Sequence, residues 1–134
     1  MPIELSSRLL ETLLLEARAA YPRECCGILL GEGERIERVL PTANVHPAPN
    51  THFEIDPQAL VDAHRAARGG GPQVVGYYHS HPAGQPEPSA TDRAHASADG
   101  RVWAIVGVGV GGGEVRFWRD TPGGFAPLSR APSA

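Results

Sequence analysis

The chain has 134 residues, a formal net charge of −3 at pH 7, 41% hydrophobic residues and two cysteines. This length suits one domain with a single substantial core. The chain has no Lys/Arg-rich run to indicate a nucleic-acid surface, and two cysteines make no disulfide framework. It also lacks an N-terminal signal pattern and an apolar run of membrane-spanning length, so we expect a soluble cytoplasmic protein.

Cap and breaker residues divide the N-terminal half into five expected elements. These are a short strand within residues 1–5, a helix from a cap at Ser6 or Ser7 to about Ala20, strands over residues 25–31 and 35–40, and a helix from the cap Asp56 to about Arg68. Pro57 occupies the first position of the second helix, where its missing N–H costs nothing. Residues 41–52, which contain three prolines, form a loop that we expect near the functional site.

The C-terminal half continues with strands and a third helix. The expected elements are a strand over residues 73–79, a helix from the cap Ser89 to about Ala98, strands over residues 101–110 and 114–119 joined by Gly111-Gly112-Gly113, and a last strand over residues 125–128. Residues 1–129 then make one domain, and residues 130–134 make a short polar tail. Helices and strands interleave while several neighbouring strands are joined as hairpins, which predicts an α+β fold with a mixed sheet.

The segment His79-Ser80-His81-Pro82 lies where the strand over residues 73–79 runs out. Residues two apart on a strand share a face, roughly 7 Å apart at the backbone, so His79 and His81 can converge on one ion while Ser80 faces away. Pro82 cannot donate to a sheet and should end the strand. The two imidazoles are therefore expected at a strand end, where a site can open to solvent.

Six residues later, the segment Ser89-Ala90-Thr91-Asp92 begins a helix. Ser89 and Asp92 are three apart and should project together, so a loop folding back past His81 can deliver Asp92 as a third ligand. The plain alternative is a capping box, in which the acid only satisfies a backbone N–H. Next to a His-x-His at a strand end, we favour a zinc ion with three protein ligands and a fourth position left for water.

Other ionisable residues are alternative candidates for the site. His95 lies three residues after Asp92 and could close the fourth position, but closed structural zinc sites are usually rich in cysteine. Three further histidines lack a ligand-like pattern and are interpreted as surface or packing residues: His46, His52 and His64. Cys25 and Cys26 are adjacent at the start of a buried strand, where a small apolar side chain fits the core.

The pattern His-x-His-Pro, six residues, Ser-x-x-Asp resembles the JAMM signature of MPN-domain metalloproteases. The segment Tyr21-Pro22-Arg23-Glu24-Cys25-Cys26-Gly27 is similar to the Pro-x-Glu-x-Cys-Gly element of that family. Asn44 and the segment over residues 53–57 also fall where the family has similar residues. The resemblance runs from about residue 3 to residue 129 and implies a single α/β/α-like MPN-type domain, with a mixed, mainly antiparallel curved sheet flanked by helices.

The resemblance also implies the role of each site residue. His79, His81 and Asp92 match the ligands of one zinc ion, Glu24 matches the catalytic glutamate, and Ser89 matches the serine that assists the tetrahedral intermediate. Spacing alone does not select Glu24, because other glutamates are equally ionisable. These residue types suit hydrolysis of peptide or isopeptide bonds. Zinc activates a water molecule, a carboxylate accepts the proton of that water, and a hydroxyl stabilises the developing oxyanion.

The short connections of this chain resemble the compact prokaryotic members of the family. Some of those act on the C-terminal tails of small ubiquitin-like or sulfur-carrier proteins, which makes such a protein the expected partner. An extended tail could add along a strand edge and bring its scissile bond to the zinc. The alternatives are a catalytically inactive MPN-type scaffold and a hydrolase or deaminase of small molecules. For a zinc deaminase, His52-Phe53-Glu54 gives only half of the signature, and there is no Cys-x-x-Cys.

Overall fold

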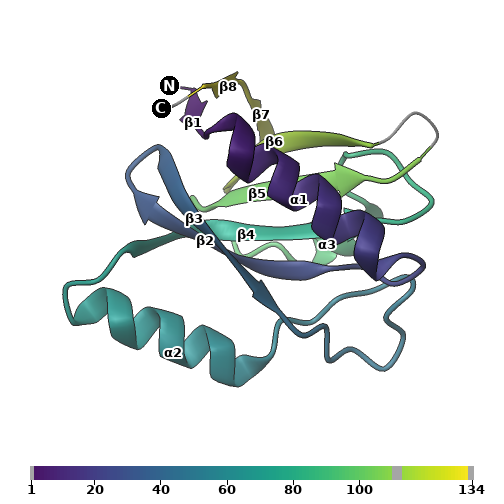
Figure 1. Ribbon diagram of the computed structural model, residues 1–134, viewed down its shortest axis with the longest axis horizontal. Helices are drawn as coiled ribbons and strands as arrows, with labels where there is room; N and C mark the ends of the chain where they lie inside the picture. Colours follow the sequence, from purple (N-terminus) through teal and green to yellow (C-terminus); the bar gives the residue numbers. More distant parts are fainter. Residues whose placement is uncertain (1, 110–112, 133–134) are drawn as a thin grey trace.

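The computed structural model describes residues 2–109 and 113–132, and its framework is one twisted eight-stranded sheet (Figure 1). The strands are β1 (Ile3–Glu4), β2 (Cys26–Glu32), β3 (Arg35–Thr42), β4 (Gln73–His81), β5 (Val102–Gly107), β6 (Glu114–Thr121), β7 (Gly124–Leu128) and β8 (Arg130–Ala131). The helices are α1 (Ser7–Ala20), α2 (Pro57–Arg68) and α3 (Ala90–His95). None of the helices in the described residues is long and apolar enough to cross a membrane.

The strands lie in the order β7-β6-β5-β4-β2-β3-β1-β8. The hairpin-linked pairs β2–β3, β5–β6 and β6–β7 are antiparallel, as is β2–β4. In contrast, β4 and β5 run parallel, because α3 crosses between them. The sheet is therefore mixed, as the interleaved pattern predicts.

Helices α1 and α2 cover opposite faces of the sheet, which gives the α/β/α-like layering (Figure 1). The core on the α1 side includes Leu13, Leu29 and Tyr78, while the core on the α2 side includes Ile28 and Ala63. Successive residues of β2 and β4 thus serve different cores, as expected for side chains that alternate across a sheet. The α+β fold class is confirmed.

The helix starts agree with the caps read from the sequence. The Ser6 hydroxyl accepts from the Leu9 amide at 3.2 Å, and the Asp56 carboxylate accepts from the Gln58 amide at 3.1 Å, with Pro57 opening α2. The predicted strands over residues 25–31, 35–40 and 73–79 are each present with ends shifted by one or two residues. The strand predicted over residues 101–110 is shorter, since β5 ends at Gly107; Val110 at its predicted end and Gly111 and Gly112 of the predicted connection lie outside the described residues.

Two further predicted boundaries differ from the structure. The third helix ends at His95 instead of Ala98, because the Asp120 carboxylate accepts from the amides of Ser97 and Ala98 at 3.0 and 3.1 Å and diverts the chain. The polar tail predicted for residues 130–134 is also incorrect in part. Arg130–Ala131 form β8 and pair with β1, so the sheet extends past residue 129.

Candidate metal centre and active site

Strand β4 places two histidines on the α2 side of the sheet. His79 pairs across the sheet with Cys26 of β2, and its side chain is 1% exposed. One residue further, Ser80 and Cys25 exchange two hydrogen bonds, from the Cys25 amide to the Ser80 hydroxyl at 2.8 Å and from the Ser80 amide to the Cys25 carbonyl at 3.1 Å. This register sets Glu24, which precedes β2, beside His81.

Asp92 reaches the histidines from the first turn of α3. The Ser89 hydroxyl accepts from the Asp92 amide at 3.0 Å, and the Asp92 carboxylate accepts from the Ser89 amide at 2.9 Å. This is the capping box that the sequence offered as an alternative. The capping role does not exclude the other one, because the same carboxylate also lies against both histidines. The cap fixes the position and the rotamer of Asp92.

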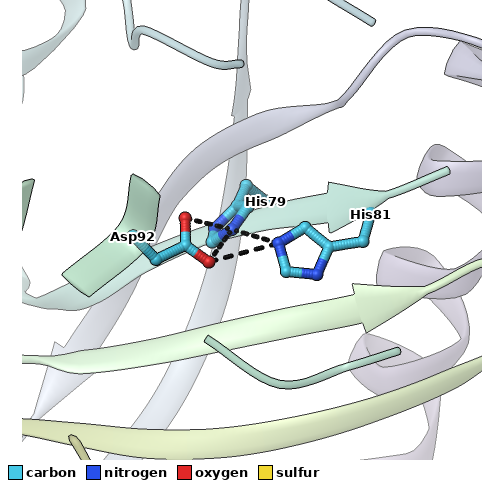
Figure 2. Close-up of side chains that lie close together, drawn as sticks. All are labelled: His79, His81 and Asp92. Carbon is cyan, nitrogen blue, oxygen red and sulfur yellow. Dashed lines mark hydrogen bonds and ion pairs between the residues drawn. The ribbon is translucent and has the colours of Figure 1, made fainter. Parts of the chain in front are cut away.

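Three potential ligand atoms converge in front of the end of β4 (Figure 2). The Nε2 atoms of His79 and His81 lie 3.1 Å apart. His79 Nε2 is 3.1 Å from each carboxylate oxygen of Asp92, and His81 Nε2 is 3.2 Å from Oδ2. Figure 2 shows that both rings point at the carboxylate that α3 supplies.

These distances match the donor set of a tetrahedral metal ion. Bonds of about 2.0–2.1 Å in a tetrahedron separate the ligand atoms by about 3.3 Å, close to the observed spacings. His81 Nδ1 lies 2.8 Å from the Gln85 carbonyl, which only an N–H can approach. The lone pair of neutral His81 is therefore on Nε2 and directed at the other donors. Two nitrogen donors and one carboxylate can hold a metal ion here, with no fourth ligand among the described residues.

The electrostatics of the three groups favour a bound cation. Burial alone would raise the pKa of Asp92, but hydrogen bonds from His79 and His81 outweigh it and hold the pKa well below its ordinary value. Burial lowers the pKa of His79, so this ring is neutral and able to coordinate near pH 7. Burial also opposes protonation of His81, but Asp92 and the Gln85 carbonyl together raise its pKa. Two donors are therefore in their coordinating form at neutral pH, and a metal ion competes with one proton at His81.

Glu24 is the buried carboxylate beside this group. The residue is 6% exposed, its amide donates to the Pro49 carbonyl at 2.8 Å, and its own carbonyl accepts from the Asn44 side chain at 3.0 Å. Burial raises the pKa of Glu24 to about 7, with His81 opposing and Asp92 adding to the shift. A carboxylate with a pKa close to neutrality can both accept and return a proton.

A cleft of about 380 Å³ opens over the group. Its walls include Glu24, His81, Ser89 and Asp92, so all these side chains face one space. The loop between β4 and α3 forms part of the wall and passes over Gly107, where a Cβ would lie 2.9 Å from the Gly84 carbonyl. Glycine at position 107 thus allows the loop to close over the sheet and to present the Gln85 carbonyl to His81.

The remaining candidates lie outside the convergent group. His95 lines the cleft but is exposed and does not belong to the group, so the closed site with His95 as fourth ligand has no support. His46 and His52 stack on each other in the loop before α2, with ring centroids 4.7 Å apart. Cys25 and Cys26 are buried free thiols, and burial raises their pKa values to about 12 and about 11. Such thiols are unreactive packing groups.

Sequence reasoning missed the residues that surround the histidines. Phe53 stacks on the His79 ring at 4.2 Å, and Trp103 meets the same ring edge-on at 5.7 Å. The carboxamide of Asn44 holds the loop that carries Phe53. The resemblance marked Asn44 and the segment over residues 53–57 by position only. Their contacts could not be read from it, because the loop has no periodicity from which to place its side chains.

The comparisons with known proteins assign the chain to one family. The model for prokaryotic homologs of the JAB domain matches residues 6–121, so the chain belongs to the prokaryotic JAB family, a compact branch of the JAMM/MPN proteins. A solution structure of a protein from Desulfitobacterium hafniense is similar with a TM-score of 0.84 and 29% identity, over 97% of this chain and 92% of that one. The JAB1/MPN domain protein from Archaeoglobus fulgidus shares the fold, with a TM-score of 0.62, 21% identity and 96% of each chain covered.

The chain is also similar in sequence to several curated proteins whose names state an activity. The chain is 41% identical to the desampylase of Haloferax volcanii, over 63% of this chain and 62% of that protein. It is 43% identical to the "Probable TtuB-protein conjugate cleaving protease" of Thermus thermophilus, over 60% and 56% of the two chains. It is 36% identical to the CysO-cysteine peptidase of Mycobacterium tuberculosis, over 73% and 68%. The chain therefore covers less than two thirds of the length of the first two of these proteins.

Proposed function

We propose that this chain is a zinc-dependent JAMM-type peptidase or isopeptidase in which His79, His81 and Asp92 hold one zinc ion. The observation that carries the proposal is the convergence of these three donors at 3.1–3.2 Å in a cleft that also contains a buried glutamate. Two imidazoles with one carboxylate and no fourth protein ligand are typical of catalytic zinc sites, whereas structural sites have four. When bound, the ion supplies an acidified water and polarises a substrate carbonyl.

Glu24 is the general base in this proposal. Its carboxylate faces the same cleft as His81 and Asp92, and its pKa of about 7 suits a group that takes a proton from water and returns it to the departing amine. Backbone hydrogen bonds on both sides of Glu24 keep it at this position while its side chain remains available for proton transfer.

Ser89 is the proposed donor to the developing oxyanion. Its oxygen accepts from the Asp92 amide, which leaves the hydroxyl hydrogen able to donate into the cleft. The capping box therefore supports two functions at once, because it orients both the Asp92 carboxylate and the Ser89 hydroxyl. A donor fixed in advance stabilises developing charge without reorganising during the reaction.

The proposed substrate is the C-terminal tail of a small ubiquitin-like or sulfur-carrier protein, either free with an added residue or joined to a target. The names of the relatives support this class, because they include a desampylase, a protease that cleaves protein conjugates and a peptidase for a carrier joined to cysteine. An extended tail without side chains at the scissile bond can approach the bottom of the cleft closely. The alternative, an inactive scaffold, would require loss of a ligand or of the glutamate, and all are present.

Metal analysis and cleavage of a substrate panel test the proposal together. The purified chain should hold one zinc ion per molecule and should cleave carrier-protein conjugates, with products identified by mass spectrometry. Glu24→Gln should retain zinc and lose about 10²–10⁴-fold in kcat, the range that general acid–base groups contribute. Glu32→Gln is the matched control, because Glu32 is exposed at the other end of β2. Zinc loss in Glu24→Gln would refute its role as a base that is not a ligand.

A further inference from the structure

The two histidines of the metal group are held in different ways. His81 Nδ1 bonds to the Gln85 carbonyl at 2.8 Å, which fixes its ring in the manner usual for metal-binding histidines. His79 Nδ1 is buried and has no hydrogen-bond partner among the described residues. Something other than an outer hydrogen bond must therefore hold the ring of His79 in its orientation.

Aromatic packing supplies this constraint. The Phe53 ring lies nearly parallel to the His79 ring, with an interplanar angle of 16° and centroids 4.2 Å apart. The Trp103 ring meets His79 at 87° and Phe53 at 79°, so the three rings form one packed corner. A ring stacked on one face by Phe53 and flanked by Trp103, which also contacts Phe53, cannot turn without displacing its neighbours.

Phe53 lies in an irregular loop, and one side chain fixes the backbone on both sides of it. Asn44 Nδ2 donates to the His52 carbonyl at 3.0 Å, and Asn44 Oδ1 accepts from the Glu54 amide at 3.1 Å. The backbone bridge between Asn44 and Ile55 continues this pairing. The backbone is thus fixed by Asn44 at the residues immediately before and immediately after Phe53.

The same carboxamide also reaches Glu24. Asn44 Nδ2 donates to the Glu24 carbonyl at 3.0 Å, and the Glu24 amide donates to Pro49 in the same loop. One side chain therefore links the backbone of the proposed base to the loop that carries the ring against His79. Side chains that bind several buried backbone groups at once lose all of these contacts when they are replaced.

We propose that Phe53 and Asn44 are positioning residues for the metal centre: Phe53 holds the ring of His79, and Asn44 holds Phe53 together with the backbone of Glu24. This inference rests on the proposed zinc site. It assigns to ring stacking the task that hydrogen-bonded carbonyls or carboxylates perform for most metal-binding histidines. Neither residue belongs to the group of metal donors.

The first experiment measures zinc affinity with a competing chelator, which needs no substrate. Phe53→Leu should weaken zinc binding about 10-fold or more, because loss of an outer-shell constraint typically costs 10–100-fold in metal affinity. Phe53→Tyr keeps the ring and should restore the wild-type affinity. Phe125→Leu is the matched control, since Phe125 packs on Trp103 with ring centroids 5.0 Å apart but has no ring contact with His79.

The second experiment tests the link through Asn44 by a double-mutant cycle. Asn44→Asp keeps an oxygen acceptor for the Glu54 amide but removes the donor to His52 and Glu24. It should weaken zinc binding in the wild-type background and have little further effect when Phe53 is already leucine, because the effect on the metal passes through Phe53. At saturating zinc, Asn44→Asp should still lower kcat through Glu24, whereas Phe53→Leu should recover most of its kcat.

The outcomes separate this inference from the proposed function. If wild-type protein binds no zinc, or His79→Ala binds zinc as wild type does, the zinc site is wrong and the positioning role fails with it. If wild type binds zinc at His79 and folded Phe53→Leu binds it as tightly as Phe125→Leu, only the positioning role of Phe53 is overturned. Additive effects of Asn44→Asp and Phe53→Leu on zinc affinity would overturn the link between them.

Discussion

The polar side chains on the two faces of β4 are arranged in different ways. On the α1 side, the Tyr78 hydroxyl donates to Glu16 at 2.6 Å, and the Ser80 hydroxyl accepts from the Cys25 amide at 2.8 Å. On the α2 side, His79 and His81 direct their Nε2 atoms at each other and at one carboxylate. Residues 78–81 of one strand thus alternate between the two faces. On the α1 side each polar group has its own partner, and on the α2 side the polar groups meet at one point.

The difference shows how one strand can serve both stability and function. A buried donor that meets an acceptor stabilises the fold modestly and costs much when its partner is lost. Three coordinating groups gathered at one point can instead bind a single cation together, so they are arranged for a ligand. Substitutions on the α1 face should therefore change the stability of the fold, and those on the α2 face should change metal binding.

The largest effect is expected from Asp92→Ala. This change removes one of the three proposed metal donors together with the acceptor for the Ser89 amide. Zinc affinity should therefore fall by at least about 100-fold, beyond the cost of losing a residue that only supports a ligand. Metal content after dialysis against a chelator measures it. Unchanged zinc content would contradict the ligand assignment and remove the contrast between the two faces.

The second prediction concerns the pH dependence of hydrolysis. Burial raises the pKa of Glu24 to about 7, so the base is protonated below that value and ionised above it. A cation held by the neighbouring donors lowers this pKa. We therefore expect kcat/KM to rise about tenfold per pH unit along the acid limb of the profile. The rise should level off at the pKa of Glu24, at or below about pH 7.

Zinc occupancy must be measured across the same pH range, because protonation of His81 also releases metal. A limb that persists at constant occupancy belongs to Glu24. A flat profile between pH 5 and pH 8 with constant zinc would contradict the role of Glu24 as the base.

The sequence predicted the parts of this site that follow a regular period. Alternation along a strand put His79 and His81 on one face, and the helix start put Ser89 next to Asp92. Glu24 could not be placed in this way, because its position depends on the register between β2 and β4, which are not consecutive strands. Only the resemblance to a known family singled out that glutamate.

The contacts made by irregular segments could not be predicted. Asn44 and Phe53 act through a loop whose hydrogen bonds follow no period. The end of α3 likewise depends on Asp120, which lies 22 or more residues from the amides that it accepts from. The fold class could be read from local patterns, while these details depend on contacts between distant parts of the chain.

The third prediction is a loss of stability from Gly27→Ala, on the α1 side of the sheet. Gly27 pairs with Tyr78, and a Cβ there would overlap the hydroxyl oxygen and the ring of that tyrosine. The buried ring must shift, which should lower the free energy of unfolding by roughly 1–3 kcal/mol. Denaturant unfolding measures it, with Gly109→Ala as control because nothing lies within 4 Å of its Cβ. Zinc affinity of the folded variant should stay unchanged.

The smallest effect is expected from Tyr78→Phe, and its pH dependence makes it informative. Burial raises the pKa of Glu16, and the hydrogen bond from Tyr78 partly opposes that shift. Without the hydroxyl, the half-buried carboxylate loses its donor, and the free energy of unfolding should fall by about 0.5–1.5 kcal/mol at neutral pH. The pKa of Glu16 in the folded state then rises further above its unfolded value.

The sign of the pH effect follows from this shift. A raised folded pKa means that the folded state favours protonated Glu16, so the deficit of Tyr78→Phe is full above the folded pKa and shrinks as pH falls through it. Unfolding curves at about pH 4 and pH 8 should show the difference, and in a Glu16→Gln background the deficit should not vary with pH. A deficit equally large at both pH values with Glu16 present would mean that the hydroxyl stabilises the fold without depending on the charge of Glu16. The case for paired polar groups on the α1 face would then rest on Ser80 and Cys25.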